Sequence, residues 1–281
     1  MVNFNGTLHD TSSNLLSLEN RGYTYGDALF ETLKVVHGKV LFWEDHYFRL
    51  MSSMRILRME IPMNFTMEFL ESEILKTVEA NALMAASARV RINVHREAEG
   101  KYTPSTNAIG YNMVTEKLAS DFYVLSQEPY TVELFKDFYV APGLLSTLKT
   151  NNKSINVLGS IFAKENNFHN CFLLNTDKTV VEALNGNLFL VKDRVIKTPP
   201  LSEGCLKGIM RKQIMELVEK LEGYVLEEAP ISPFELQKAD ELFITNIIVG
   251  IQPITKYRKK EYTADVSKLI LEKLNIKIRL S

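Results

Sequence analysis

Two lysines near the middle of the chain could supply a reactive amine. Lys153 stands at the start of an apolar, helix-like run, NKSINVLGSIFAKENN (residues 152–167), and Lys149 lies four residues earlier. A lysine amine forms Schiff bases with carbonyl compounds, and it exchanges protons near neutral pH once burial or neighbouring charge lowers its pKa. A solvated lysine at a helix start is the ordinary alternative. The residues around each lysine must therefore indicate whether it is a reactive amine or a solvent-exposed side chain.

Other kinds of catalytic site lack support in the sequence. The chain has no motif of nucleotide-binding loops, serine hydrolases, kinases or zinc proteases. Cys171 and Cys205 lie among apolar residues without CxxC spacing, which indicates core residues rather than a disulfide framework or a zinc site. We expect no metal, because the histidines also show no ligand spacing; they stand at positions 9, 37, 46, 95 and 169.

The composition is that of an ordinary globular protein. The 281 residues, 46% hydrophobic and 24% charged, suffice for one large domain or two medium ones. Lys plus Arg number 33 against 34 Asp plus Glu, so the net charge of −1 favours neither nucleic acid nor an anionic membrane surface as a partner. The N-terminus, MVNFNGTLHD, does not read as a signal peptide, and no apolar run approaches the ~20 residues of a membrane span. We expect a cytoplasmic protein that acts on small molecules.

Hydrophobic periodicity predicts two α+β domains. The N-terminal domain is expected over residues 1–120, a linker over 121–131, and the C-terminal domain over 132–281, with no regular βαβ alternation. Expected helices cover 44–56, 66–80, 154–167, 208–221, 232–238 and 264–274, and expected strands cover 2–8, 32–36, 39–43, 88–94, 134–141, 171–175, 187–191, 194–197, 223–227 and 241–245.

Six stretches, taken in order, resemble the aminotransferase class IV family of pyridoxal-phosphate enzymes. This family includes branched-chain aminotransferases, D-amino acid aminotransferases and aminodeoxychorismate lyases. The resemblance implies fold type IV, with a small N-terminal α/β domain and a larger β-barrel-like C-terminal domain with helices. It also implies pyridoxal 5'-phosphate as cofactor and a homodimer. The stretches are residues 20–36, 44–50, 89–104, 153–164, 180–211 and 240–254.

The resemblance assigns roles to particular residues. Lys153 takes the position of the Schiff-base lysine, which also moves the proton at the substrate α-carbon. Glu182 takes the position of the carboxylate at the pyridine nitrogen, and Arg49 that of the arginine at the phosphate. Further cofactor-binding positions are Asn187, Ile209, Met210 and Ile247, the second and third of which open a helix.

Lys149 stays open as the alternative lysine. Its distance to Glu182 is the more usual one for the family, and it also has an Asn three residues on. KSINVLGSIFAK, however, matches the family in register, so Lys153 is preferred although the segment after Lys164 must then be three residues shorter than in relatives.

The expected substrate residues lie in the N-terminal domain. They are Phe30, Arg91, Asn93 and Arg96. Arginines that alternate along a strand, as in RVR, share one face and could clamp a carboxylate. The alternatives are core packing for Phe30 and an exposed sheet face for the arginines.

Departures from the family keep several functions open. Met210 replaces a threonine of the common GITR sequence, and EALNGN (residues 182–187) lacks two hydroxyl side chains. Thr245-Asn246 followed by Gly250 is similar to aminodeoxychorismate lyases. We expect transamination between a branched-chain-like amino acid and a 2-oxo acid. The alternatives are a 4-amino-4-deoxychorismate lyase, which releases pyruvate and 4-aminobenzoate, and a non-catalytic binding protein of the same fold.

Overall fold

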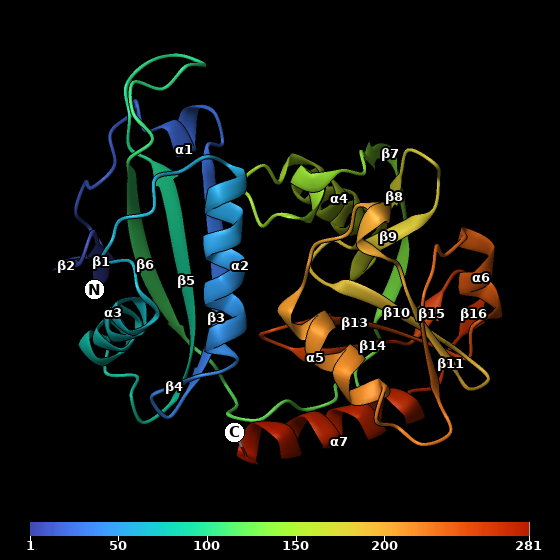
Figure 1. Ribbon diagram of the computed structural model, residues 1–281. Coiled ribbons are helices and arrows are strands. Elements are labelled where there is room, and N and C mark those ends of the chain that lie inside the picture. Colours follow the sequence, from blue (N-terminus) through green and yellow to red (C-terminus); the bar gives the residue numbers. More distant parts are fainter. Residues whose placement is uncertain (281) are drawn as a thin grey trace. The chain divides into compact units, whose positions relative to one another are not determined.

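The computed structural model describes residues 1–280, which form two compact units (Figure 1). Unit 1 comprises Met1–Asp121 and the short segment Lys149–Asn152. Unit 2 comprises Phe122–Leu148 and the described chain from Lys153 onward. The expected linker thus belongs almost entirely to unit 2, and the two candidate lysines belong to different units.

Unit 1 is built on a six-stranded antiparallel sheet with the order β2-β1-β6-β5-β3-β4. Its long central strands pair in a register that sets Phe30 opposite Asn93. The segment Lys149–Asn152 lies along β3, since Thr150 forms a bridge with Leu29. The strands are β1 (Val2–Phe4), β2 (Thr7–His9), β3 (Ala28–Val36), β4 (Lys39–Val40), β5 (Ser87–Arg96) and β6 (Ile109–Lys117).

One face of this sheet carries the core of unit 1. Leu29, Leu33 and Val35 of β3 are buried with Val90 and Val94 of β5. The helices α2 (Trp43–Ile56) and α3 (Met67–Ala80) pack on these side chains, while α1 (Arg21–Thr24) is a single turn. Because strand side chains alternate, the neighbouring even positions of β3 lie on the other face.

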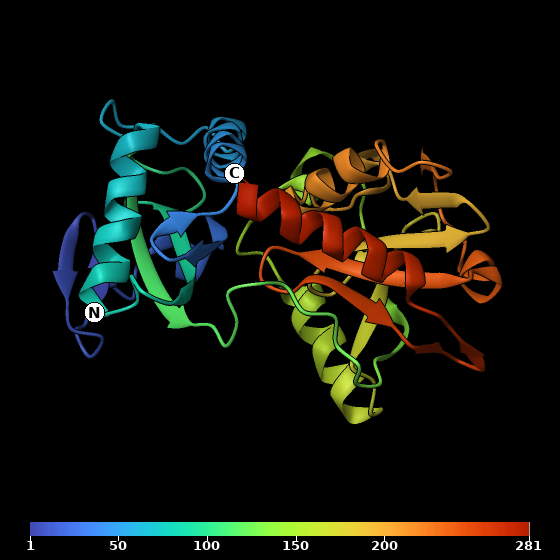
Figure 2. The same ribbon diagram turned by 90° about the horizontal axis from the view of Figure 1, so that it is seen from below.

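Unit 2 contains two five-stranded sheets (Figure 2). Their orders are β12-β11-β10-β13-β14 and β16-β15-β7-β8-β9, and side chains of both sheets share one apolar core. The strands are β7 (Thr131–Val140), β8 (Asn170–Asn175), β9 (Val180–Ala183), β10 (Asn187–Lys192), β11 (Val195–Thr198), β12 (Val225–Glu228), β13 (Glu241–Asn246), β14 (Gly250–Ile254), β15 (Lys256–Tyr257) and β16 (Lys260–Glu261). The helices are α4 (Ser154–Glu165), α5 (Ile209–Val218), α6 (Pro233–Lys238) and α7 (Asp265–Leu280), with short 3-10 turns η1 (Leu144–Thr147) and η2 (Leu201–Glu203).

The predicted α+β class is confirmed, and the helices expected at 44–56 and 66–80 are confirmed to within a residue at each end. Two expected strands are wrong. Residues 2–8 form a hairpin, because Asn5 and Gly6 take positive φ and turn the chain. The strand expected over 39–43 stops at Val40, because Phe42 is left-handed and α2 begins at Trp43.

Two kinds of feature are absent from the described part of the chain. Within residues 1–280, no helix combines the length and apolarity that crossing a membrane requires. The same residues contain no cluster of three histidine, cysteine or acidic side chains able to hold a metal ion.

The buried carboxylate of Glu241 should stabilise unit 2. It accepts hydrogen bonds from the backbone N–H groups of Val266 (2.7 Å) and Ser267 (3.0 Å) in the first turn of α7, and from the Ser267 hydroxyl (2.9 Å). Glu241→Ala would leave these buried donors without an acceptor, so we expect a loss of about 3 kcal/mol in the free energy of unfolding. Urea unfolding measures it.

Glu261→Ala is the matched control, because this β16 glutamate is exposed and its ion pair with Lys256 is long, at 4.0 Å. We expect its effect to stay within about 0.5 kcal/mol. Equal effects of the two substitutions would contradict the stabilising role of Glu241.

Candidate active site

Glu182 is held in a fixed orientation by two donors in unit 2. Its Oε2 accepts from the side-chain amide of Asn187 (3.1 Å) and from the backbone N–H of Leu206 (3.0 Å). The same amide of Asn187 also donates to the Leu206 carbonyl (2.9 Å). Asn187, which opens β10, is buried. The Glu182 carboxylate is therefore built into the unit rather than lying loose at a strand end.

The helix α5 begins next to this carboxylate. Its N-cap is Gly208, so no side-chain oxygen caps the first turn. A Cβ on Gly208 would lie 2.0 Å from Asn187 Oδ1, so only glycine fits at this position. Ile209 and Met210 follow and are buried. A helix N-terminus without a side-chain cap offers backbone N–H groups and a partial positive charge to an anion.

Lys153 also lies near Glu182 in unit 2. It is the N-cap residue of α4 and has no side-chain cap hydrogen bond. Burial lowers the pKa of its amine, while the charge of Glu182 acts in the opposite direction. Asn156 ties the helix to the segment after Glu182, because its side chain donates to the Leu184 carbonyl (2.8 Å).

Ile247 lies in the tight connection between β13 and β14. Its carbonyl accepts a hydrogen bond from the Tyr123 hydroxyl (2.6 Å). Asn246 braces the same turn, since its Oδ1 accepts from the backbone N–H groups of Ile248 and Val249, each at 3.0 Å. These bonds fix the backbone of the turn. A fixed backbone is what the predicted cofactor-binding role of Ile247 requires.

Three of the expected substrate residues lie together in unit 1, on the sheet face opposite the core. The Arg91 guanidinium lies over the Phe30 ring, 4.2 Å from its centre. Arg91 Nε donates to Asn93 Oδ1 (3.0 Å), and Asn93 in turn donates to Asn112 Oδ1 (3.0 Å). The cationic side chain of Arg91 thus stacks on the aromatic ring of Phe30, and hydrogen bonds through the side-chain amides of Asn93 and Asn112 orient it.

Lys149 joins this group. Its carbonyl accepts from Phe30 N–H (2.9 Å), and Asn151 N–H donates to the Ala28 carbonyl (3.0 Å), so the backbone runs beside β3. Its amine lies 4.5 Å from the centre of the Phe30 ring. The charge of Lys149 also contributes to lowering the pKa of His46. Sequence reasoning alone gave Lys149 no such neighbours.

Arg49 lies on α2 and pairs with a buried carboxylate. Its Nε and Nη2 donate to the two oxygens of Glu31 at 2.7 Å and 2.5 Å. His46, one turn earlier on the same helix, shares that carboxylate. Glu31 and His46 were not expected as site residues, although the spacing of His46 and Arg49 places both on one helix face.

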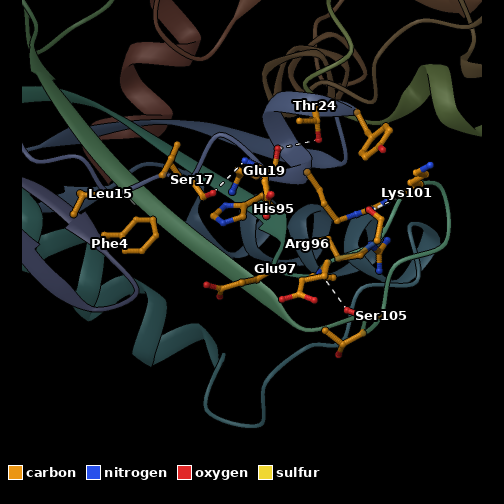
Figure 3. Close-up of a pocket in the computed structure, with 18 residues that line it drawn as sticks. Phe4, Leu15, Ser17, Glu19, Thr24, His95, Arg96, Glu97, Lys101 and Ser105 are labelled. Carbon is orange, nitrogen blue, oxygen red and sulfur yellow. Dashed lines mark hydrogen bonds between the residues drawn. The ribbon is translucent and has the colours of Figure 1, made fainter.

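Arg96 lies apart from the other expected substrate residues. Its guanidinium donates to Asp27 (2.9 Å), to Asn107 Oδ1 (2.5 Å) and to two backbone carbonyls. It lines a cavity of about 840 Å³, where Figure 3 shows it near His95 and Lys101. Arg91 and Arg96 are five positions apart, and because strand side chains alternate, an odd separation places them on opposite faces of β5.

The donor set fits pyridoxal 5'-phosphate. In unit 2, the N-terminus of α5 suits its phosphate and the fixed carboxylate of Glu182 suits its ring nitrogen. In unit 1, the guanidinium of Arg49 is a group that suits a phosphate. A lysine amine suits its aldehyde, and each unit supplies one candidate. The threonine hydroxyl missing at Met210 leaves backbone groups as the donors of α5.

Comparison with known proteins identifies the family. The model of the amino-transferase class IV family matches residues 28–257. The chain is 30% identical over 264 residues to a putative branched-chain-amino-acid aminotransferase of Methanocaldococcus jannaschii, covering 90% of this chain and 86% of the relative. It is 27% identical over 252 residues to an aminodeoxychorismate lyase of Vibrio harveyi, covering 88% and 89%.

A solved structure shows the same fold. The branched-chain amino acid aminotransferase of Escherichia coli superposes with a TM-score of 0.88 at 21% identity, over 99% of this chain and 94% of that one. The fold type IV architecture expected from the sequence is thereby confirmed. Together with the match of the family model, this places the chain in the amino-transferase class IV family of pyridoxal-phosphate enzymes.

Proposed function

We propose that this protein is an aminotransferase that moves the amino group of a branched-chain-like amino acid to a 2-oxo acid. The observation that carries the proposal is the arrangement around Asn187, which orients Glu182 and packs against Gly208 at the start of α5. One side chain thus organises a carboxylate for a ring nitrogen and an anion-binding helix start. The relative at 30% identity, named as a putative branched-chain-amino-acid aminotransferase, favours this substrate class.

Each residue has a defined task in the proposed reaction. Bound pyridoxal phosphate supplies a protonated ring that takes up the electron pair left at the substrate α-carbon. Glu182 keeps the ring nitrogen protonated, and Arg49 with the first N–H groups of α5 holds the phosphate. Arg91, oriented by Asn93, binds the substrate carboxylate. The lysine amine removes the proton from the α-carbon.

We assign the cofactor-holding amine to Lys149 rather than to Lys153. On the pyridoxal ring, the aldehyde carbon is next to the carbon that bears the phosphate arm and opposite the nitrogen. Lys149 shares unit 1 with Arg49, and the charges of both act on His46. Lys153, in contrast, lies near Glu182, the partner proposed for the nitrogen. The usual family spacing to Glu182 also supports Lys149.

A lyase is the second candidate. Thr245-Asn246 at the end of β13, with Gly250 opening β14, is similar to aminodeoxychorismate lyases, and one relative carries that name. Both reactions begin with removal of the α-proton, and they differ in what happens next. The non-catalytic alternative loses its support, because the family is one of enzymes.

We also propose that two copies of the chain associate through α4. This helix exposes three apolar side chains on successive turns, with fractional exposures of 56% for Val157, 41% for Leu158 and 48% for Ile161. Because each is about half exposed, burying them would stabilise a dimer by about 0.7 to 1.5 kcal/mol each. A second copy is the occupant that the symmetry of most soluble oligomers favours.

Substitution of each lysine tests the assignment of the amine. We expect Lys149→Ala to abolish the absorbance of bound pyridoxal phosphate and to lower activity by about 10²- to 10⁴-fold, because no amine then holds the cofactor or moves the proton. Lys153→Ala should keep the absorbance. The exposed Lys164 on α4 gives the control Lys164→Ala, which should behave like the unaltered protein. The reverse outcome for the first two variants would assign the amine to Lys153.

Product analysis tests the reaction. We expect glutamate from branched-chain amino acids with 2-oxoglutarate, because the Arg91 guanidinium can bind the α-carboxylate of either the amino acid or the 2-oxo acid. A parallel incubation with 4-amino-4-deoxychorismate should release no pyruvate. Pyruvate alone would establish the lyase instead. If neither glutamate nor pyruvate forms, both candidate functions are contradicted.

Light scattering after gel filtration tests the dimer. Val157→Glu together with Ile161→Glu would place two charges in the proposed interface, so we expect a monomer where the unaltered protein is a dimer. Lys220→Glu, at an exposed position away from α4, is the control for added negative charge and should leave the dimer intact. A monomeric unaltered protein would refute the proposed association.

A further inference from the structure

Glu31, His46 and Arg49 form a buried group in unit 1, here called the Glu31 group. Glu31 is 2% exposed and His46 fully buried, and the Arg49 side chain is 9% exposed. Glu31 stands on the core face of β3, while the other two stand one turn apart on α2, which packs on that face. The group therefore links the sheet to the helix that carries the proposed phosphate-binding arginine.

The contacts fix the plane of the Arg49 guanidinium. Glu31 Oε1 accepts from Nε (2.7 Å), and Oε2 accepts from Nη2 (2.5 Å), which makes a bidentate pair. His46 Nδ1 lies 2.8 Å from the same Oε2. A bidentate pair sets the direction as well as the position of the guanidinium. Because the carboxylate is itself held by His46, Arg49 has a fixed rather than a mobile counterpart.

The charges of the group are settled by its surroundings. Burial alone would raise the pKa of Glu31, but the charge of Arg49 and the hydrogen bond to His46 outweigh it and lower this pKa to about 2. Burial lowers the pKa of His46, so its imidazole is neutral and Nδ1–H donates to the carboxylate. Its Nε2 is buried and has no hydrogen-bond partner among residues 1–280.

We propose that Glu31 is a positioning residue that orients Arg49 toward the cofactor phosphate. The proposal rests on the function proposed above, in which Arg49 binds that phosphate. Glu31 has two opposing effects on an anion: its charge repels the phosphate, and its bidentate pair holds the guanidinium ready before the phosphate binds. Orientation dominates, because an arginine otherwise loses the freedom of its long side chain when it binds.

Two substitutions separate these effects. Glu31→Asp keeps the charge but withdraws the carboxylate by one methylene, which breaks the bidentate pair. Glu31→Gln keeps the size but removes the charge. Orientation predicts that both weaken binding of pyridoxal phosphate by about tenfold or more. If charge dominated, the first would have little effect and the second would strengthen binding. The dissociation constant is measured by absorbance titration of the cofactor-free protein.

Pyridoxal, which lacks the phosphate, is the decisive second probe. Its affinity should change less than threefold in both variants, because only the phosphate contacts Arg49. Glu116→Gln is the matched control, since Glu116 pairs with Arg89 on the exposed side of unit 1, and it should change neither affinity. In an Arg49→Gln background, Glu31→Gln should have no further effect on pyridoxal phosphate affinity.

The outcomes distinguish failure of this inference from failure of the proposed function. An unaltered protein that binds no pyridoxal phosphate would refute the proposed function itself. Equal losses for pyridoxal and pyridoxal phosphate, tighter binding by Glu31→Gln, or unfolded Glu31 variants would overturn the positioning role. In the last case the Glu31 group would serve the stability of unit 1 instead.

Discussion

Neighbouring side chains of β3 face opposite sides of the unit 1 sheet, and both chemical groups of this unit depend on that alternation. Phe30 faces away from the core, where Arg91 and Lys149 meet its ring. Glu31, the next residue, faces the core, where its carboxylate pairs with the guanidinium of Arg49 on α2. A single strand therefore separates a surface suited to a substrate carboxylate from a buried group suited to a phosphate ligand. A shift of one residue in the β3 register would exchange the two.

In unit 2, the side-chain amide of Asn187, rather than the alternation of a strand, positions the groups of the candidate site. Asn187 bonds Glu182 and the Leu206 carbonyl while leaving no room for a side chain at Gly208. The start of α5 and the carboxylate of Glu182 are thereby placed by the same residue. The first N–H groups of α5, to which we assign phosphate binding, therefore have positions that Asn187 helps to fix.

Local sequence patterns predicted the parts of the fold that depend on local burial. The apolar spacing over residues 44–56 and 66–80 matched α2 and α3, since each helix packs one face on the sheet. The hairpin at Asn5-Gly6 was missed although Asn-Gly is a strong turn signal. β6 was missed because many of its side chains are polar or exposed and lack a clear alternation.

The residues of the candidate site were predictable in kind but not in grouping. Glu182, Asn187 and the start of α5 were expected from family motifs, and the structure gives them common contacts. The neighbours of Lys149 could not be predicted, because the bridge from Thr150 to Leu29 joins residues far apart in the chain. Arg96 looked equivalent to Arg91 in the sequence, yet Asp27 and backbone carbonyls occupy its donors.

The return of Lys149–Asn152 to unit 1 limits how this chain can be divided. A fragment cut after Asp121 would lack the segment that borders β3, and the remaining fragment would carry that segment without its strand partner. The two units are thus not interchangeable modules that recombination could join at a single point. Insertions or fusions should be tolerated at the polar loop before β6, whereas a break between the two lysines would separate β7 from the other strands of its sheet in unit 2.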